Sequence, residues 1–91
     1  MKNNVNNFER RRKLNERKFD NWQDLPGGGR KYWFEIRGKF GYLARYLKEV
    51  NSEEKTIRFS QEIYNSDGDL IEIHRKYPVD EGHKIVKENK K

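Results

Sequence analysis

Side chains capable of acid–base chemistry gather in the second half of the chain. His74 can gain or lose a proton near neutral pH. Either Glu62 or Glu72 offers a carboxylate, and Tyr46 a phenol, that could act with it. Arg58 could hold the phosphate of a substrate. Together these residue types would suit metal-independent cleavage of RNA. They also serve ordinary cross-strand pairing on an exposed sheet, which is the alternative interpretation.

Metal and cofactor chemistry finds less support in the sequence. Glu62, Glu72 and His74 could bind a divalent ion, but they form no specific ligand motif, so we expect no metal site and no cofactor. Cysteine is absent, which excludes disulfides and cysteine-ligated zinc. The glycines at 27–29 precede a predicted strand rather than a helix, and no Gly-Lys-Ser/Thr motif follows them. They therefore do not predict a phosphate-binding loop.

Charge is unevenly distributed along the 91 residues, which are too few for more than one domain. Charged residues make up 40% of the chain and hydrophobic residues 32%, a composition that favours disorder, but the aromatic residues indicate an ordered middle. Residues 1–31 carry nine Lys and Arg against four Asp and Glu, whereas residues 32–78 carry eight of each sign. This basic excess indicates an arm that meets a polyanion, or a solubilising tail.

Alternation of apolar and polar residues predicts the fold class α+β, with a curved antiparallel meander of four strands in a sheet domain at 32–78. The four strands are expected at 32–37, 40–50, 56–64 and 70–77. Residues 1–25 are expected to form a basic arm with a weakly amphipathic helix over 8–22. We expect a glycine-rich hinge at 26–31 and a polar tail at 79–91.

A three-residue loop at 66–68, with Gly68 in the left-handed conformation, is predicted between the last two strands. This loop would place Ile63 opposite Ile71 and put both on one apolar face. The polar residues that would interrupt this face, either as its margin or as a notch for an anion, are Arg45, Gln61 and Arg75. The opposite face would be polar and aromatic, with one row formed by Tyr46, Ser60 and His74.

Exposed tyrosines beside basic residues are typical of surfaces on which single-stranded nucleic acid stacks, although such surfaces also bind proteins. We therefore expect the ligand to be nucleic acid, RNA rather than DNA, or a cognate partner protein, with a homodimer as a further option. The residues expected to contact nucleic acid are Arg10, Arg11, Arg12, Lys13, Arg17, Lys18, Arg30, Lys31, Tyr42, Tyr46, Arg58 and Tyr64. No apolar run is long enough for a membrane span or a signal-peptide core, so we expect a cytoplasmic protein without a membrane partner.

Residues 59–84 combine a strand–turn–strand pattern with the sequence Tyr-Pro-Val-Asp-Glu-Gly-His at 77–83. This part of the chain resembles small uncharacterised prokaryotic proteins with a Tyr-Pro-Val-Asp-x-Gly-His ending. It is more distantly similar to TumE-like components of toxin–antitoxin pairs. The resemblance implies a small curved sheet that acts in a two-component module on RNA. It also implies a role for His83, although TumE-like proteins have a second histidine where this chain has Lys84.

Two classes of function follow from these observations. The first is a small nucleic-acid-binding or toxin-like protein, and the second is a non-catalytic interaction module or accessory subunit. A small metal-independent ribonuclease is a further alternative, because the chain offers both acid–base groups and cations. Its candidate catalytic residues are His74, His83, Glu62 and Tyr46.

Overall fold

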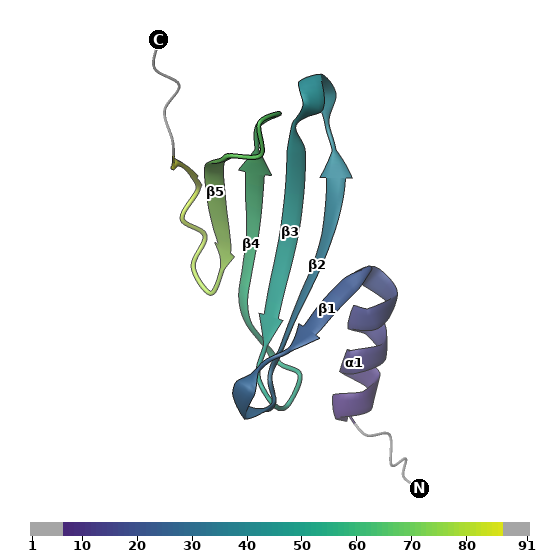
Figure 1. Ribbon diagram of the computed structural model, residues 1–91. Helices are drawn as coiled ribbons and strands as arrows, with labels where there is room; N and C mark the ends of the chain where they lie inside the picture. The colour runs from purple at the N-terminus through teal and green to yellow at the C-terminus, as the bar shows by residue number, and fades with distance from the viewer. Residues whose placement is uncertain (1–6, 87–91) are drawn as a thin grey trace, which may run out of the picture.

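The computed structural model describes residues 7–86, which form one α-helix followed by a six-stranded antiparallel sheet (Figure 1). Residues 1–6 of the predicted arm and 87–91 of the predicted tail lie outside this range. The strands follow one another in the sheet in the order of the chain, so the topology is a meander. The elements are α1 (Asn7–Lys18), β1 (Asn21–Asp24), β2 (Arg30–Arg37), β3 (Leu43–Val50), β4 (Thr56–Tyr64), β5 (Leu70–Tyr77) and β6 (His83–Ile85).

The predicted α+β class with an antiparallel sheet is confirmed, but the prediction of four strands is wrong, because β1 and β6 extend the sheet to six. The helix ends at Lys18 and does not reach residue 22. Residues 21–24 instead pair with β2, where Trp22 lies opposite Tyr32 and Asp24 opposite Arg30. The pairing of residues 21–24 with β2 is stabilised by a side-chain hydrogen bond, which the Asp24 carboxylate accepts from Arg30 at 2.7 Å.

The sequence predicts a hinge at 26–31, but residues 30 and 31 belong to β2, and the glycines before them form the tight connection between β1 and β2. The Leu25 amide donates to the Gly29 carbonyl at 2.9 Å, and Gly27 has a φ of 87° that favours glycine. A Cβ atom at Gly29 would lie 2.5 Å from the Val50 carbonyl oxygen. Glycine therefore allows this turn to pack closely against the end of β3.

The predicted loop at 66–68 is present, but the register beyond it differs from the prediction. Gly68 has a φ of 88°, and its amide donates to the Asn65 carbonyl at 3.0 Å. Tyr64 lies opposite Leu70, whereas Ile63 lies opposite Glu72, so Ile71 is an extra residue in β5. This β-bulge moves Ile73 to the face opposite from Ile63 and overturns the predicted composition of both faces.

The sheet therefore has two faces that differ from the predicted ones. We call the face against which α1 packs the helix face, and the other one the outer face. Cross-strand partners share a face, so the helix face carries Tyr32, Phe34, Tyr46, Lys48, Val50, Phe59, Gln61, Ile63, Glu72, His74 and His83. The outer face carries Trp33, Glu35, Arg45, Leu47, Glu49, Arg58, Ser60, Glu62, Ile73 and Arg75.

The hydrophobic core is small and lies where α1 meets one end of the sheet (Figure 1). Phe19, Tyr32 and Val50 are buried, and Phe34 and Phe59 pack against them. The Phe19 ring lies 5.7 Å from the Tyr32 ring and 5.4 Å from the Phe34 ring. Burial of a side chain of this size contributes about 1.5–3 kcal/mol, so Phe19 alone is a substantial part of the attachment of the helix.

A buried carboxylate completes this core. Glu54 is 1% exposed and accepts hydrogen bonds from the Tyr32 hydroxyl, from Asn15 Nδ2 at 3.1 Å and from Arg12 Nε at 3.1 Å. Lys48 Nζ in turn donates to Asn15 Oδ1 at 2.7 Å. Because Arg12 and Asn15 belong to α1 while Tyr32 belongs to β2, Glu54 ties the helix to the sheet. A buried carboxylate with several donors is stable only while those donors remain.

We predict that Glu54→Ala lowers the free energy of unfolding by about 3–5 kcal/mol, because buried donors of α1 and β2 lose their shared acceptor. Urea denaturation followed by circular dichroism measures the change. Glu53→Ala is the matched control, since the Glu53 side chain is exposed and its change should stay within about 0.5 kcal/mol. Equal shifts of the urea midpoint in both variants would contradict the role of Glu54.

A second prediction concerns alkaline pH. Burial, and then the hydrogen bond to Glu54, raise the pKa of Tyr32 from 10.0 to about 12. Between these values the unfolded chain loses the phenolic proton while the folded chain keeps it. The free energy of unfolding therefore falls by about 3 kcal/mol in total as the pH rises through this range. Tyr32→Phe should show a shallower decline of the unfolding free energy above pH 10. A decline as steep as in the unchanged chain would contradict this assignment.

Candidate functional site

A groove on the helix face runs between α1 and the strands β3, β4 and β5. We call it the basic groove. Its volume is about 540 Å³, and its lining residues are Arg11, Lys18, Phe19, Lys48, Lys55, Thr56, Phe59 and Tyr77. Four of these side chains are cationic and three are aromatic, and no carboxylate is among them. The groove therefore combines a positive potential with flat apolar surfaces.

Two lysines flank the buried phenylalanine at the inner end of the basic groove. Lys18 Nζ lies 6.0 Å and Lys48 Nζ 5.9 Å from the centre of the Phe19 ring. Burial, and then the charge of Lys18, lower the pKa of Lys48. Two ammonium groups that repel one another in this way would gain stability from a bound anion.

Lys76 continues this positive surface toward the middle of the sheet. Its Nζ lies 5.6 Å from the centre of the Tyr46 ring and 5.8 Å from that of the Phe59 ring. Tyr77 is 47% exposed and lines the groove beside Phe59. Cations and aromatic rings thus alternate along the groove, which suits a ligand that has both negative charges and flat rings.

One row of side chains crosses the helix face from β2 to β6 beyond Lys76. The row consists of Phe34, Tyr46, Gln61, His74 and His83, each opposite the next. The Phe34 and Tyr46 rings stack at 5.0 Å, and Gln61 Nε2 donates to the Tyr46 hydroxyl at 3.0 Å. The predicted row with Ser60 is wrong, because Ser60 lies opposite Leu47 and Arg75 on the outer face.

The two histidines form a chain of hydrogen bonds between two carboxylates. His74 Nδ1 lies 3.2 Å from His83 Nε2. His83 Nδ1 lies 2.5 Å from Glu72, and His74 Nε2 lies 2.6 Å from Asp80. The Gly82 amide, and then His74, lower the pKa of the Asp80 carboxyl. Every ring nitrogen of the pair therefore has a partner within the cluster.

The structure brings together some of the candidate catalytic residues and separates others. His74 and His83 are in contact, and Tyr46 lies in the same row. Glu62 points to the outer face, where it accepts a 2.5 Å hydrogen bond from the Tyr64 hydroxyl. The carboxylates beside the histidines are Glu72 and Asp80. The sequence Asp-Glu-Gly at 80–82 could have indicated Asp80, because an aspartate two residues before a glycine can accept its amide proton, as Asp80 does at 2.9 Å.

Several cations that were expected to contact nucleic acid form ion pairs with carboxylates instead. Arg12 binds the buried Glu54, and Arg58 binds Glu49 at 2.5 Å. Arg30 is 7% exposed between Glu16 and Asp24. Burial lowers the pKa of Arg30, but the hydrogen bonds to Asp24 and Glu16 outweigh this effect, so the pKa is raised. These three arginines therefore stabilise the fold.

The other predicted contact residues are spread over the molecule. Arg11 and Lys18 line the basic groove, and Tyr46 lies at its end. Those exposed on α1 are Arg10, Lys13 and Arg17. Those away from the groove are Lys31 and Tyr64 on the outer face and Tyr42, whose carbonyl accepts the Gly38 amide at 2.8 Å. Four lining residues were not predicted as binding residues, because the groove exists only where α1 lies against the sheet, which the strand pattern does not show; they are Lys48, Lys55, Phe59 and Tyr77.

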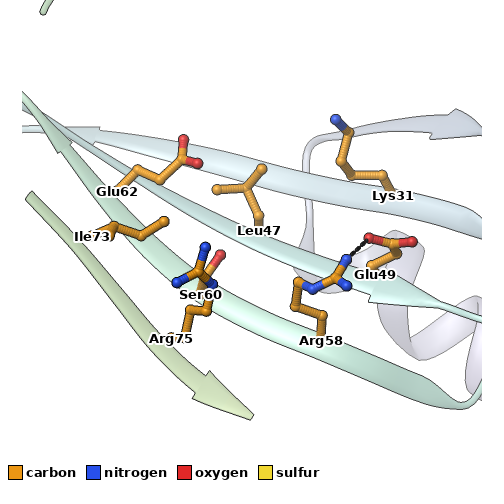
Figure 2. A pocket seen from close by; sticks show the side chains of 8 residues that line it. All are labelled: Lys31, Leu47, Glu49, Arg58, Ser60, Glu62, Ile73 and Arg75. Carbon is orange, nitrogen blue, oxygen red and sulfur yellow. Dashed lines mark hydrogen bonds and ion pairs between the residues drawn. The ribbon is translucent and has the colours of Figure 1, made fainter. Parts of the chain in front are cut away.

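A second hollow, of about 340 Å³, lies on the outer face (Figure 2). Its charges are of both signs, since Lys31, Arg58 and Arg75 alternate with Glu49 and Glu62. Figure 2 shows Arg58 directed at Glu49 and Arg75 beside Ser60. The compensated charge makes this hollow less suited to a polyanion than the basic groove.

The predicted anion notch of Arg45, Gln61 and Arg75 is not formed. Gln61 lies on the helix face, whereas Arg45 and Arg75 lie on the outer face, because the β3–β4 pairing places Gln61 opposite Tyr46. Arg45 binds Glu35 at 2.6 Å and lies over the Tyr64 ring at 5.0 Å. The extra residue at the start of β5 and the observed β3–β4 register thus separate the three side chains.

Two further observations apply to the described residues 7–86. They contain no group of three or more His, Cys, Asp and Glu side chains that surrounds a point where a metal ion could sit. In the same range, no helix has both the length and the apolar composition needed to cross a membrane.

Comparisons of the chain with protein-family models, with curated proteins and with solved structures find no match.

Proposed function

We propose that this protein binds single-stranded RNA along the basic groove, as a small nucleic-acid-binding protein. The observation that supports this function is the absence of any carboxylate among side chains that include four cations and three aromatic rings. Lys55 pairs with Glu53 at 3.5 Å outside the lining, which leaves three cations of the groove, Arg11, Lys18 and Lys48, without an ion pair among the described residues. A phosphate backbone needs such uncompensated cations, because each phosphate contact releases counterions. Arg12, Arg30 and Arg58, by contrast, are already paired with carboxylates.

Aromatic rings favour a single strand over a duplex. Phe59 and Tyr77 can stack only on bases whose faces are free, and base stacking on an aromatic ring contributes about 1–3 kcal/mol per base. Beyond Lys76, the Tyr46 hydroxyl and the Gln61 amide offer hydrogen bonds that a ribose 2′-hydroxyl could use. The resemblance to TumE-like proteins adds the expectation that such a chain works in a two-component module.

The hydrogen-bond partners of His74 and His83 favour RNA binding over RNA cleavage. A general base needs a free nitrogen within reach of the substrate. Both nitrogens of His74 and both nitrogens of His83 are engaged within the cluster of Glu72, Asp80 and the two rings. A ribonuclease mechanism would require this cluster to open first.

A protein partner is the second candidate function, and a different surface supports it. Phe40 is 87% exposed in the β2–β3 connection, and Ile36 at the nearby end of β2 is 52% exposed. Exposed apolar side chains at a hairpin tip suit contact with another protein. This surface is separate from the groove, so the Phe40→Ser variant should leave RNA binding unchanged.

Groove binding predicts a specific salt dependence. Lys18→Gln combined with Lys76→Gln removes two cations that contact no carboxylate in the groove, so the slope of log affinity against log salt should fall by about 1.4. Fluorescence anisotropy with a labelled oligouridine RNA at several salt concentrations measures this slope. Tyr77→Ala should weaken binding by about 1–3 kcal/mol.

The matched control changes two lysines outside the groove. Lys31→Gln combined with Lys39→Gln removes the same charge from the outer face and from the β2–β3 connection. If this control reduces the slope as much as the groove variant does, the RNA has no defined position. Absence of binding by the unchanged chain at low salt would refute the proposed function altogether.

A further inference from the structure

We propose that His74 and His83 chelate a divalent transition-metal ion of the Zn²⁺, Ni²⁺ or Cu²⁺ type. This site is separate from the basic groove and does not depend on RNA binding. Its basis is the short distance between His74 Nδ1 and His83 Nε2, which face one another at 3.2 Å. Imidazole nitrogen is the ligand that these borderline ions prefer.

The distance between the two nitrogens fits a shared ion. Metal–imidazole bonds are about 2.0–2.1 Å long, so nitrogens 3.2 Å apart would enclose an N–metal–N angle of about 100–106°. This value is close to the tetrahedral angle that zinc sites adopt. The ring centres lie 4.3 Å apart with 53° between the planes, so the rings are not stacked face to face.

The outer nitrogens of both rings are held by carboxylates. Glu72 contacts His83 Nδ1 at 2.5 Å, and Asp80 contacts His74 Nε2 at 2.6 Å. A carboxylate on the far nitrogen fixes the tautomer of a ligating histidine and makes its other nitrogen a better donor to the metal. In the free protein the two facing nitrogens share a hydrogen bond. A bound metal ion would take the place of the shared proton, which passes to solvent, while each ring keeps the proton that it donates to its carboxylate.

The backbone holds the two ligands in register. His74 and His83 are direct partners in the β5–β6 ladder, and the Val86 amide donates to the Ile71 carbonyl at 2.9 Å. The connection between the strands is tied by the Glu81 amide, which donates to the Arg75 carbonyl at 2.8 Å. Ligands on paired strands lose little freedom on binding, which favours chelation.

Access and open coordination positions follow from the location at the edge of the sheet. The His83 side chain is 52% exposed, and that of His74 is 14% exposed. Two protein ligands leave at least two positions of a tetrahedral ion open to water or to an anion such as phosphate.

Isothermal titration calorimetry of the full, untagged chain with ZnCl₂, NiCl₂ and CuCl₂ tests the proposal. We expect one ion per chain at micromolar protein concentration, and no binding of MgCl₂, because Mg²⁺ prefers oxygen ligands. His74→Ala and His83→Ala should each abolish this binding. Glu72→Gln and Asp80→Asn should each weaken it by about 10–100-fold, because the rings remain but lose their anchors.

Glu81→Gln is the matched control, because Glu81 neighbours Asp80 and pairs with Arg75 and Lys84 rather than with a histidine. It should leave the affinity for Zn²⁺ unchanged. Circular dichroism of each variant shows whether the sheet persists, so that loss of binding is not mistaken for unfolding. Absence of binding by the folded unchanged chain, or equal affinity in His74→Ala, would overturn the proposal. Either result would leave the RNA-binding groove untouched.

Discussion

The buried carboxylate of Glu54 is the interaction on which the arrangement of helix and sheet depends. It lies in the β3–β4 connection, 1% exposed, and accepts hydrogen bonds from α1 through Arg12 and Asn15 and from β2 through Tyr32. Its φ of 65° is unusual for a residue other than glycine, so the connection adopts a costly backbone conformation at this position. A small apolar core with Phe19 at its centre and the ion pair between Glu16 and Arg30 support the same attachment. Polar and apolar contacts therefore act together at one end of the sheet, where either set alone would be weak.

This one-sided attachment determines which cations are available. The cations near the attachment form ion pairs within the fold. Arg12 pairs with Glu54, and Arg30 pairs with Glu16 and Asp24. Where α1 diverges from β4 and β5, Lys18 and Lys48 meet no carboxylate in the groove lining, whereas Lys55 pairs with Glu53 at 3.5 Å. The net charge of +6 on the whole chain is a poor guide to these differences. What matters for a polyanion is which cations remain uncompensated, and that depends on where the helix is fastened.

The sequence was most informative about local structure. The loop at 66–68 and the left-handed Gly68 were predictable, because an Asp-Gly pair between alternating runs has a strong preference of its own. The extra residue Ile71 was not, because the two consecutive apolar residues Leu70 and Ile71 do not by themselves show that one of them is unpaired. The energetic cost of this bulge depends on packing between neighbouring strands, which the residue pattern of one strand does not reveal. Strand β1 was missed for a similar reason, since the pairing of Trp22 with Tyr32 exists only after the chain has turned.

The position of the bulge also explains why the histidines and the basic groove share a face. Without the extra Ile71, the pairing would place Gln61 opposite Ile73, and His74 would lie on the outer face beside Ser60. With it, His74 lies opposite Gln61 and on the same side as Lys76, whose ammonium group contacts the Tyr46 and Phe59 rings. One inserted residue thus moves two imidazoles, a lysine and a carboxylate to the helix face together. A bulge shifts the side chains that follow it as far as the next change of register, which here lies between Ser60 and Phe59. The surface formed by Glu72, His74 and His83 is therefore lost as a unit if the bulge is removed.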